Sequence, residues 1–179
     1  MAWVAQNPAG ILRDEALVKL AETWRANDPQ EALTGFLGLT MDDGSTRGLQ
    51  AIVSQWAQDD PPVAVEHLNS LEKSARRDDL LQHALVSLAS QDPELAWKYS
   101  DRISDRKSLE HVRGMALKAM AETRPLQALK LAESGGNSEA LLAGIARGWA
   151  ATDDTAAEEW IGSLADPDLA ARLRLATSE

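Results

Sequence analysis

The hydrophobic positions of this chain follow a helical period and recur in five successive segments. In four of them, apolar residues stand seven, four and three places before a reference position, which is the spacing of one buried helical stripe. In the first segment these residues are Leu17, Leu20 and Ala21. The fourth segment departs from the pattern, because Arg113 takes the first of these places. Apolar and polar residues never alternate for long, so the pattern predicts helices and no strands.

The five segments are copies of one sequence repeat. Each reference position precedes an Asp-Pro pair or its equivalent by four residues, and an alanine follows three places after the proline position. The reference residues are Trp24, Trp56, Leu88, Met120 and Trp149, and the alanines are Ala32, Ala64, Ala96, Ala128 and Ala157. The first four copies are 32 residues apart and the fifth follows after 29. A period of roughly 20 to 50 residues is typical of solenoid proteins.

The Asp-Pro pair predicts the start of a second helix in each copy. Aspartate accepts a hydrogen bond from a free N–H at the N-cap, and proline at the first helical position has no N–H to leave unsatisfied. Arg124 replaces the aspartate in the fourth copy and Asp154 replaces the proline in the fifth, so we expect weaker starts there. The invariably small alanine position predicts a close approach between helices.

The sequence therefore predicts alternating helices joined by short loops. Reference helices, which carry the reference residues, are expected over 11–26, 45–58, 76–91, 105–122 and 137–151. Asp-Pro helices are expected over 29–40, 61–73, 93–103, 124–134 and 154–165, with a further short helix after Asp166-Pro167. The expected fold class is all-α, with αα-hairpins stacked in a right-handed superhelix as one domain over residues 1–179. Its repeat units are 11–40, 45–73, 76–103, 105–134 and 137–165, with partial repeats at both ends, including a remnant at Trp3.

The arrangement Trp-Ala-x-x-Asp-Pro-x-x-Ala resembles the tetratricopeptide and Sel1-type helical repeats. It is still more similar to arrays of the same pattern in bacterial proteins, and the resemblance covers residues 11–167. The period is 32 residues here, against about 34 in tetratricopeptide repeats. The resemblance implies a TPR-like or HEAT-like solenoid whose concave face is lined by the Asp-Pro helices and binds a peptide or protein.

Candidate binding residues occupy the places of the Asp-Pro helices that should point away from the core. The fifth, sixth and ninth places after the proline carry aromatic and cationic side chains in the later copies, and such side chains dominate interface energetics. The candidate groove residues are His67, Lys98, Tyr99, Arg102, Lys130 and Trp160. The alternative is that Tyr99 and Trp160 only cover a neighbouring layer. The reference tryptophans are expected to be core residues.

Composition narrows the class of protein. The chain has 179 residues, a net charge of −10 and no cysteine, which excludes a disulfide scaffold and argues against a general nucleic-acid binder. No apolar run approaches the roughly 20 residues of a membrane-spanning helix, and the first eight residues show no export signal. Residues 97–130 nevertheless carry 8 basic and 4 acidic side chains. Two interpretations stay open for this segment: a salt-bridged surface, or a cationic patch for an acidic peptide or for the acidic end of another copy.

Catalytic signals are weak. Asp79 and His83 share a helix face, but no further metal ligand accompanies them at a recognisable spacing. We therefore expect no enzyme activity, no metal and no cofactor. The expected function is a protein–protein interaction scaffold that binds a peptide or protein through its concave face, with self-association as a further option. The alternative is an accessory segment of a larger enzyme or sensor, and the partial repeats favour a piece of a longer or self-associating array.

Overall fold

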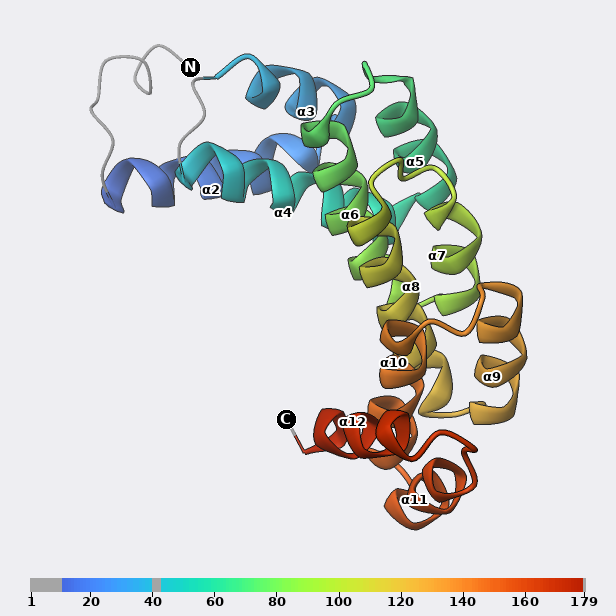
Figure 1. The fold of residues 1–179 in the computed structure, drawn as a ribbon. Helices are drawn as coiled ribbons and strands as arrows, with labels where there is room; N and C mark the ends of the chain where they lie inside the picture. Colours follow the sequence, from blue (N-terminus) through green and yellow to red (C-terminus); the bar gives the residue numbers. More distant parts are fainter. Residues whose placement is uncertain (1–10, 40–42, 179) are drawn as a thin grey trace. The chain divides into compact units, whose positions relative to one another are not determined.

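The structure is a computed structural model that describes residues 11–39 and 43–178. These residues form eleven α-helices and no strand, which confirms the all-α prediction for them. Figure 1 shows the helices in chain order with their labels. The reference helices are α2 (Ile11–Arg25), α4 (Asp43–Asp59), α6 (Ala75–Ala89), α8 (Arg106–Ala121) and α10 (Glu139–Ala150). The Asp-Pro helices are α3 (Pro29–Leu37), α5 (Pro61–Ser70), α7 (Pro93–Ser100), α9 (Pro125–Ser134), α11 (Asp154–Gly162) and α12 (Pro167–Thr177). The predicted remnant at Trp3 lies outside the described residues.

Every predicted helix is present, but four of the Asp-Pro helices end about three residues earlier than predicted. A serine hydroxyl marks the ends of several Asp-Pro helices. Ser70, Ser134 and Ser163 each donate to the carbonyl oxygen three residues earlier, at 2.6 Å. Each hydroxyl thereby adds a hydrogen bond to a carbonyl oxygen of the last helical turn, where backbone donors run out. The Trp160 oxygen also accepts from the backbone N–H of Ser163 at 3.0 Å. The ninth place after the proline therefore belongs to a helix end in these copies.

The helix starts follow the predicted capping chemistry. The Asp28 carboxylate accepts from the backbone N–H of Glu31 at 2.8 Å, and the aspartates before α5, α7 and α12 cap in the same way. Arg124 makes no side-chain cap bond to α9, as predicted. In the fifth copy, however, Asp153 still caps α11 through the N–H of Ala156 at 3.0 Å, although no proline follows it. The cap of α11 therefore forms without a proline at the first helical position.

The chain divides into two compact units, residues 1–87 (the N-terminal unit) and 88–179 (the C-terminal unit). In the N-terminal unit, α4 packs against α2, α3 and α5. Its core includes Phe36 of α3 and Ile52 of α4, both fully buried. The repeat alanines Ala32 and Ala64 are fully buried as well, so the small position belongs to the core.

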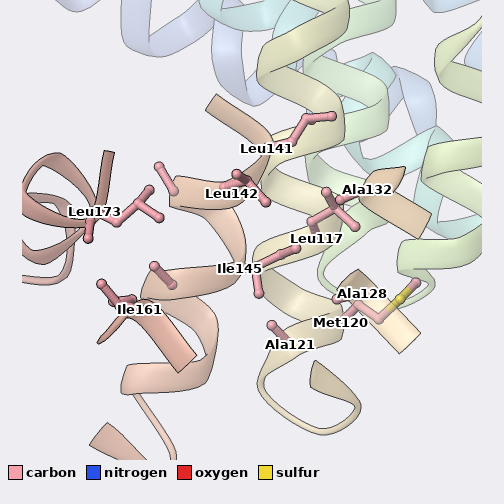
Figure 2. Packing of buried hydrophobic residues seen from close by; sticks show 13 residues of the cluster. Leu117, Met120, Ala121, Ala128, Ala132, Leu141, Leu142, Ile145, Ile161 and Leu173 are labelled. Carbon is pink, nitrogen blue, oxygen red and sulfur yellow. The ribbon is translucent and has the colours of Figure 1, made fainter. Parts of the chain in front are cut away.

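In the C-terminal unit, α8 packs against α7, α9 and α10, and α10 also packs against α11 and α12. Figure 2 shows the apolar side chains between these helices, among them Leu117 and Met120 of α8 and Ile145 of α10, with Met120 beside Ala128 of α9. Ile161 of α11 and Leu173 of α12 extend the same cluster. The helices α8, α10 and α12 form one row, and each of α9 and α11 packs against two members of that row.

Candidate binding grooves

The six predicted groove residues do not gather at one place. His67 lies on α5 in the N-terminal unit, and the other five lie on α7, on α9, on α11 or in the turn after α7. Lys98, Arg102 and Lys130 are exposed, whereas the three aromatic side chains, counting His67, are half-buried. None of the six lines the grooves described below.

The sixth place after the proline packs against the reference residue of the same copy, 11 residues earlier. The pairs seen are Trp24–Gly35, Trp56–His67 and Trp149–Trp160. The ring centroids of Trp56 and His67 are 5.3 Å apart, and the indoles of Trp149 and Trp160 stack at 5.7 Å with planes 21° apart. The Trp24 ring occupies the space that a β-carbon at Gly35 would need. The sixth place is thus a packing position in these copies, and Trp160 packs against its own copy.

The environment of His67 also favours packing over ligand binding. Its Nε2 atom is buried and has no hydrogen-bond partner among the described residues. Burial lowers the pKa of His67 below its usual 6.5, because the charged ring loses solvation. The imidazole is therefore neutral at pH 7 and lies against Trp56 as an uncharged ring.

Arg113, the departure from the apolar stripe, links α8 to α7. Its guanidinium carbon lies 4.7 Å from the ring centroid of Trp97, a cation–π geometry. Its Nε donates to the Ser100 hydroxyl at 3.0 Å and its Nη2 to the Asp101 carboxylate at 2.6 Å. The guanidinium thus replaces an apolar contact with a stacked and hydrogen-bonded one.

Several arginines of the basic segment, residues 97–130, form ion pairs. Arg106 pairs with Glu110 at 3.0 Å, and Arg124 pairs with Glu94 at 2.5 Å. Within the described part of the chain, the lysines of this segment at 98, 118 and 130 have no ion pair. The salt-bridged interpretation therefore fits those arginines, and these lysines keep their charge available.

The largest of the grooves described here lies in the N-terminal unit and has a volume of about 430 Å³. Its lining residues come only from reference helices: Glu22, Arg25, Ala51, Ser54, Gln55, Gln58 and Ser87. It therefore lies on a face of α2, α4 and α6 to which α3 and α5 contribute no side chain. We call it the amide groove. A second groove of about 390 Å³ runs past the Asp28-Pro29 and Asp60-Pro61 turns.

Hydrogen bonds within α4 and between α4 and its neighbouring helices hold the side chains of the amide groove. The Gln58 amide donates to the Ser87 hydroxyl at 2.5 Å, and the Gln55 amide donates to Asp59 at 3.1 Å. Arg25 pairs with the same Asp59 at 3.0 Å. The lining thus combines hydrogen-bond donors and acceptors with balanced charge. Sequence reasoning missed it, although the polar places on one face of the helix at 45–58 were visible.

A smaller groove of about 190 Å³ lies in the C-terminal unit between α8 and α10. Its lining residues are Glu110, His111, Gly114, Met115, Lys118, Ala140, Ala143 and Arg147. We call it the α8–α10 groove. The two helices approach closely because Gly144 and Gly148 have no side chains: a methyl group there would overlap the carbonyl oxygens of Gly114 and Lys118.

The remaining candidate ligands that the sequence offered are Asp79 and His83. His83 lies 3.7 Å from Asp79 and hydrogen-bonds through Nε2 to Gln50 at 2.8 Å. No group of three or more metal-ligating side chains occurs among the described residues. Of the helices that the structure describes, none combines the length and apolar character needed to cross a bilayer.

Comparisons with protein-family models, with curated proteins and with solved structures give no match for this chain.

Proposed function

We propose that this chain is a helical-repeat interaction module that binds an extended peptide segment of a protein partner in the amide groove. The proposal takes the repeat copies to stack as a TPR-like or HEAT-like solenoid. Bonds between equivalent helices support such stacking, since Arg47 pairs with Asp14 at 3.1 Å and Gln50 with His83 at 2.8 Å. Both pairs are 33 residues apart, about one sequence period.

The observation that carries the proposal is the lining of the amide groove. An extended peptide presents one N–H donor and one C=O acceptor per residue. A glutamine side chain offers both an acceptor oxygen and two donor hydrogens, and a serine hydroxyl also serves in either role. Gln55, Gln58, Ser54 and Ser87 therefore match a peptide backbone in chemistry whatever its side chains are.

The proposed binding face differs from the one that the resemblance implies. The resemblance places the partner on the Asp-Pro helices, whereas the amide groove is lined by reference helices. The sixth places of the Asp-Pro helices, Gly35 and His67 in this unit, are in contact with reference tryptophans. We accordingly assign the partner to the reference helices, and we assign no reaction to the chain.

A random peptide library displayed on phage and selected on the full chain tests the proposal. Selected peptides are then measured by fluorescence anisotropy against the double variant Gln55→Ala/Gln58→Ala. We expect affinity to fall about tenfold or more, because each lost hydrogen bond contributes about 1 kcal/mol. The matched control is Gln91→Ala/Gln127→Ala, two exposed glutamines outside the groove, which should bind within twofold of the wild type. Failure to enrich any peptide, or equal losses in both variants, would overturn the proposal.

A further inference from the structure

We propose that the α8–α10 groove binds an acidic side chain, aspartate or glutamate, of a partner peptide at the end where Lys118 and Arg147 lie. The inference goes beyond the amide groove, since it concerns another groove in the other unit and rests on different residues.

The size of the groove fits a single side chain. Its volume of about 190 Å³ is below the roughly 300 Å³ at which pockets for small-molecule ligands begin. Small residues, Gly114, Ala140 and Ala143, form part of the lining and leave this space open. The close approach of α8 and α10 at Gly144 and Gly148 brings the two helices to opposite walls of the same narrow groove.

Two cations stand at one end of the groove without a carboxylate partner in the described part of the chain. Lys118 of α8 is half-buried and forms no ion pair there. Arg147 of α10 donates from Nε to the backbone carbonyl oxygen of Ala176 in α12 at 3.1 Å. This bond positions the guanidinium with one of its five donors and leaves the other four for a ligand. A carboxylate that reaches both cations gains charge-assisted hydrogen bonds, which are stronger than neutral ones.

The opposite end of the groove disfavours an anion. Glu110 lines that end and pairs with Arg106 at 3.0 Å. It precedes Lys118 by eight residues on the same helix, about 12 Å along the axis. An acidic side chain is therefore attracted at the Lys118 and Arg147 end, because the Glu110–Arg106 pair gives the other end no net positive charge. The exposed His111 lies nearer the Glu110 end and adds no carboxylate to the cationic end.

Titration of the ¹⁵N-labelled full chain with a ten-residue peptide of alternating Glu and Ser tests the proposal by NMR. We expect chemical-shift changes at the amides of Gly114, Lys118, Ala143 and Arg147, and none with the peptide in which Gln replaces every Glu. The double variant Lys118→Gln/Arg147→Gln should weaken binding at least about fivefold. Lys118→Arg, which keeps the charge, should bind close to the wild type, and this variant separates the lost charge from any change in folding.

The matched control is Lys98→Gln/Lys130→Gln, which removes two exposed cations of the same unit and changes the net charge equally. It should bind the acidic peptide within about twofold of the wild type. Equal weakening in both double variants would overturn the proposal, because the attraction would then be general. Equal shifts of the same amides with a ten-residue oligothymidylate would also overturn it, as the groove would then take any anion. Neither variant touches the amide groove, so failure here leaves the peptide selection on that groove unaffected.

Discussion

The indole of Trp160 stacks on the indole of Trp149, with ring centroids 5.7 Å apart and planes inclined by 21°. The two residues stand 11 positions apart, at the reference place and the sixth place of one repeat copy. The short capped turn at Asp153 brings α11 back against α10 and places the rings face to face. Trp56 and His67 are in contact across the same two places, although their rings are tilted by 42°, so aromatic residues at the sixth place stabilise the hairpin of their own copy in both cases.

Trp160→Ala should therefore lower the free energy of unfolding by about 2–3 kcal/mol, since it removes a half-buried ring and an aromatic pair. Trp160→Phe keeps a stacked ring and should lose less than about 1.5 kcal/mol. Urea unfolding followed by far-UV circular dichroism measures both, and the exciton contribution of the coupled indoles to that spectrum should disappear in both variants. An alanine variant as stable as the wild type would show that the stack contributes nothing.

Gly148→Ala should be strongly destabilising, because the added methyl group overlaps the Lys118 carbonyl oxygen of the neighbouring helix. Overpacking of this kind costs about 1–3 kcal/mol, and here the atom in the way is backbone and cannot rotate aside. The matched control is Gly162→Ala on α11, where a methyl group would come no closer than 3.7 Å to the tip of the Arg174 side chain. The control should gain up to about 1 kcal/mol from the higher helix propensity of alanine. Equal thermal midpoints for both variants would contradict the close approach of α8 and α10.

The helices could be predicted from the sequence because their determinants are local. Aspartate at the N-cap, proline at the first position and the apolar spacing ahead of Trp56 act within a few residues of one another. The burial of Ala64 was predictable for a related reason, since only a small residue recurs at its place. The hydrogen bond that Ser70 makes at the end of α5 is local as well. The sequence does not reveal it, because a serine that bonds a carbonyl and a serine that faces solvent look the same there.

The grooves could not be predicted, because their walls come from residues about one period apart. Gln58 appears as an ordinary solvated side chain until Ser87, 29 residues later, is brought to 2.5 Å from it. Arg113 looked like a defect of the apolar stripe, and only the positions of Trp97 and Asp101 show its role. The spacing of such pairs depends on how consecutive hairpins pack, and periodicity alone does not fix that.

Asp78→Asn should be among the most destabilising substitutions in the N-terminal unit. Asp78 is 6% exposed and accepts from the Nε and Nη2 of Arg77 at 3.2 and 2.8 Å, and Arg77 itself is 2% exposed. Removing the carboxylate takes a counter-charge away from a buried guanidinium, and breaking a buried ion pair in this way costs about 3–5 kcal/mol. The adjacent Asp79→Asn is the control, since Asp79 is exposed and should change stability by less than about 0.5 kcal/mol. Chemical unfolding of both variants separates them, and equal losses would contradict the role of burial.

The lowered pKa of His67 predicts a loss of stability in mildly acidic solution. Because burial holds the folded-state pKa below 6.5, the unfolded chain takes up its proton first as the pH falls. The contribution of the neutral ring is therefore complete above pH 6.5, and it is lost as the pH falls through 6.5 towards the folded-state pKa. His67→Gln removes this titration, so its urea midpoint should fall less than that of the wild type between pH 7.5 and pH 5. Carboxylates titrate alike in both proteins, and the difference between them isolates His67. His111→Gln, which replaces an exposed histidine, should keep the wild-type dependence. A proton NMR titration that gives His67 a pKa at or above 6.5 would contradict the burial of its ring against Trp56.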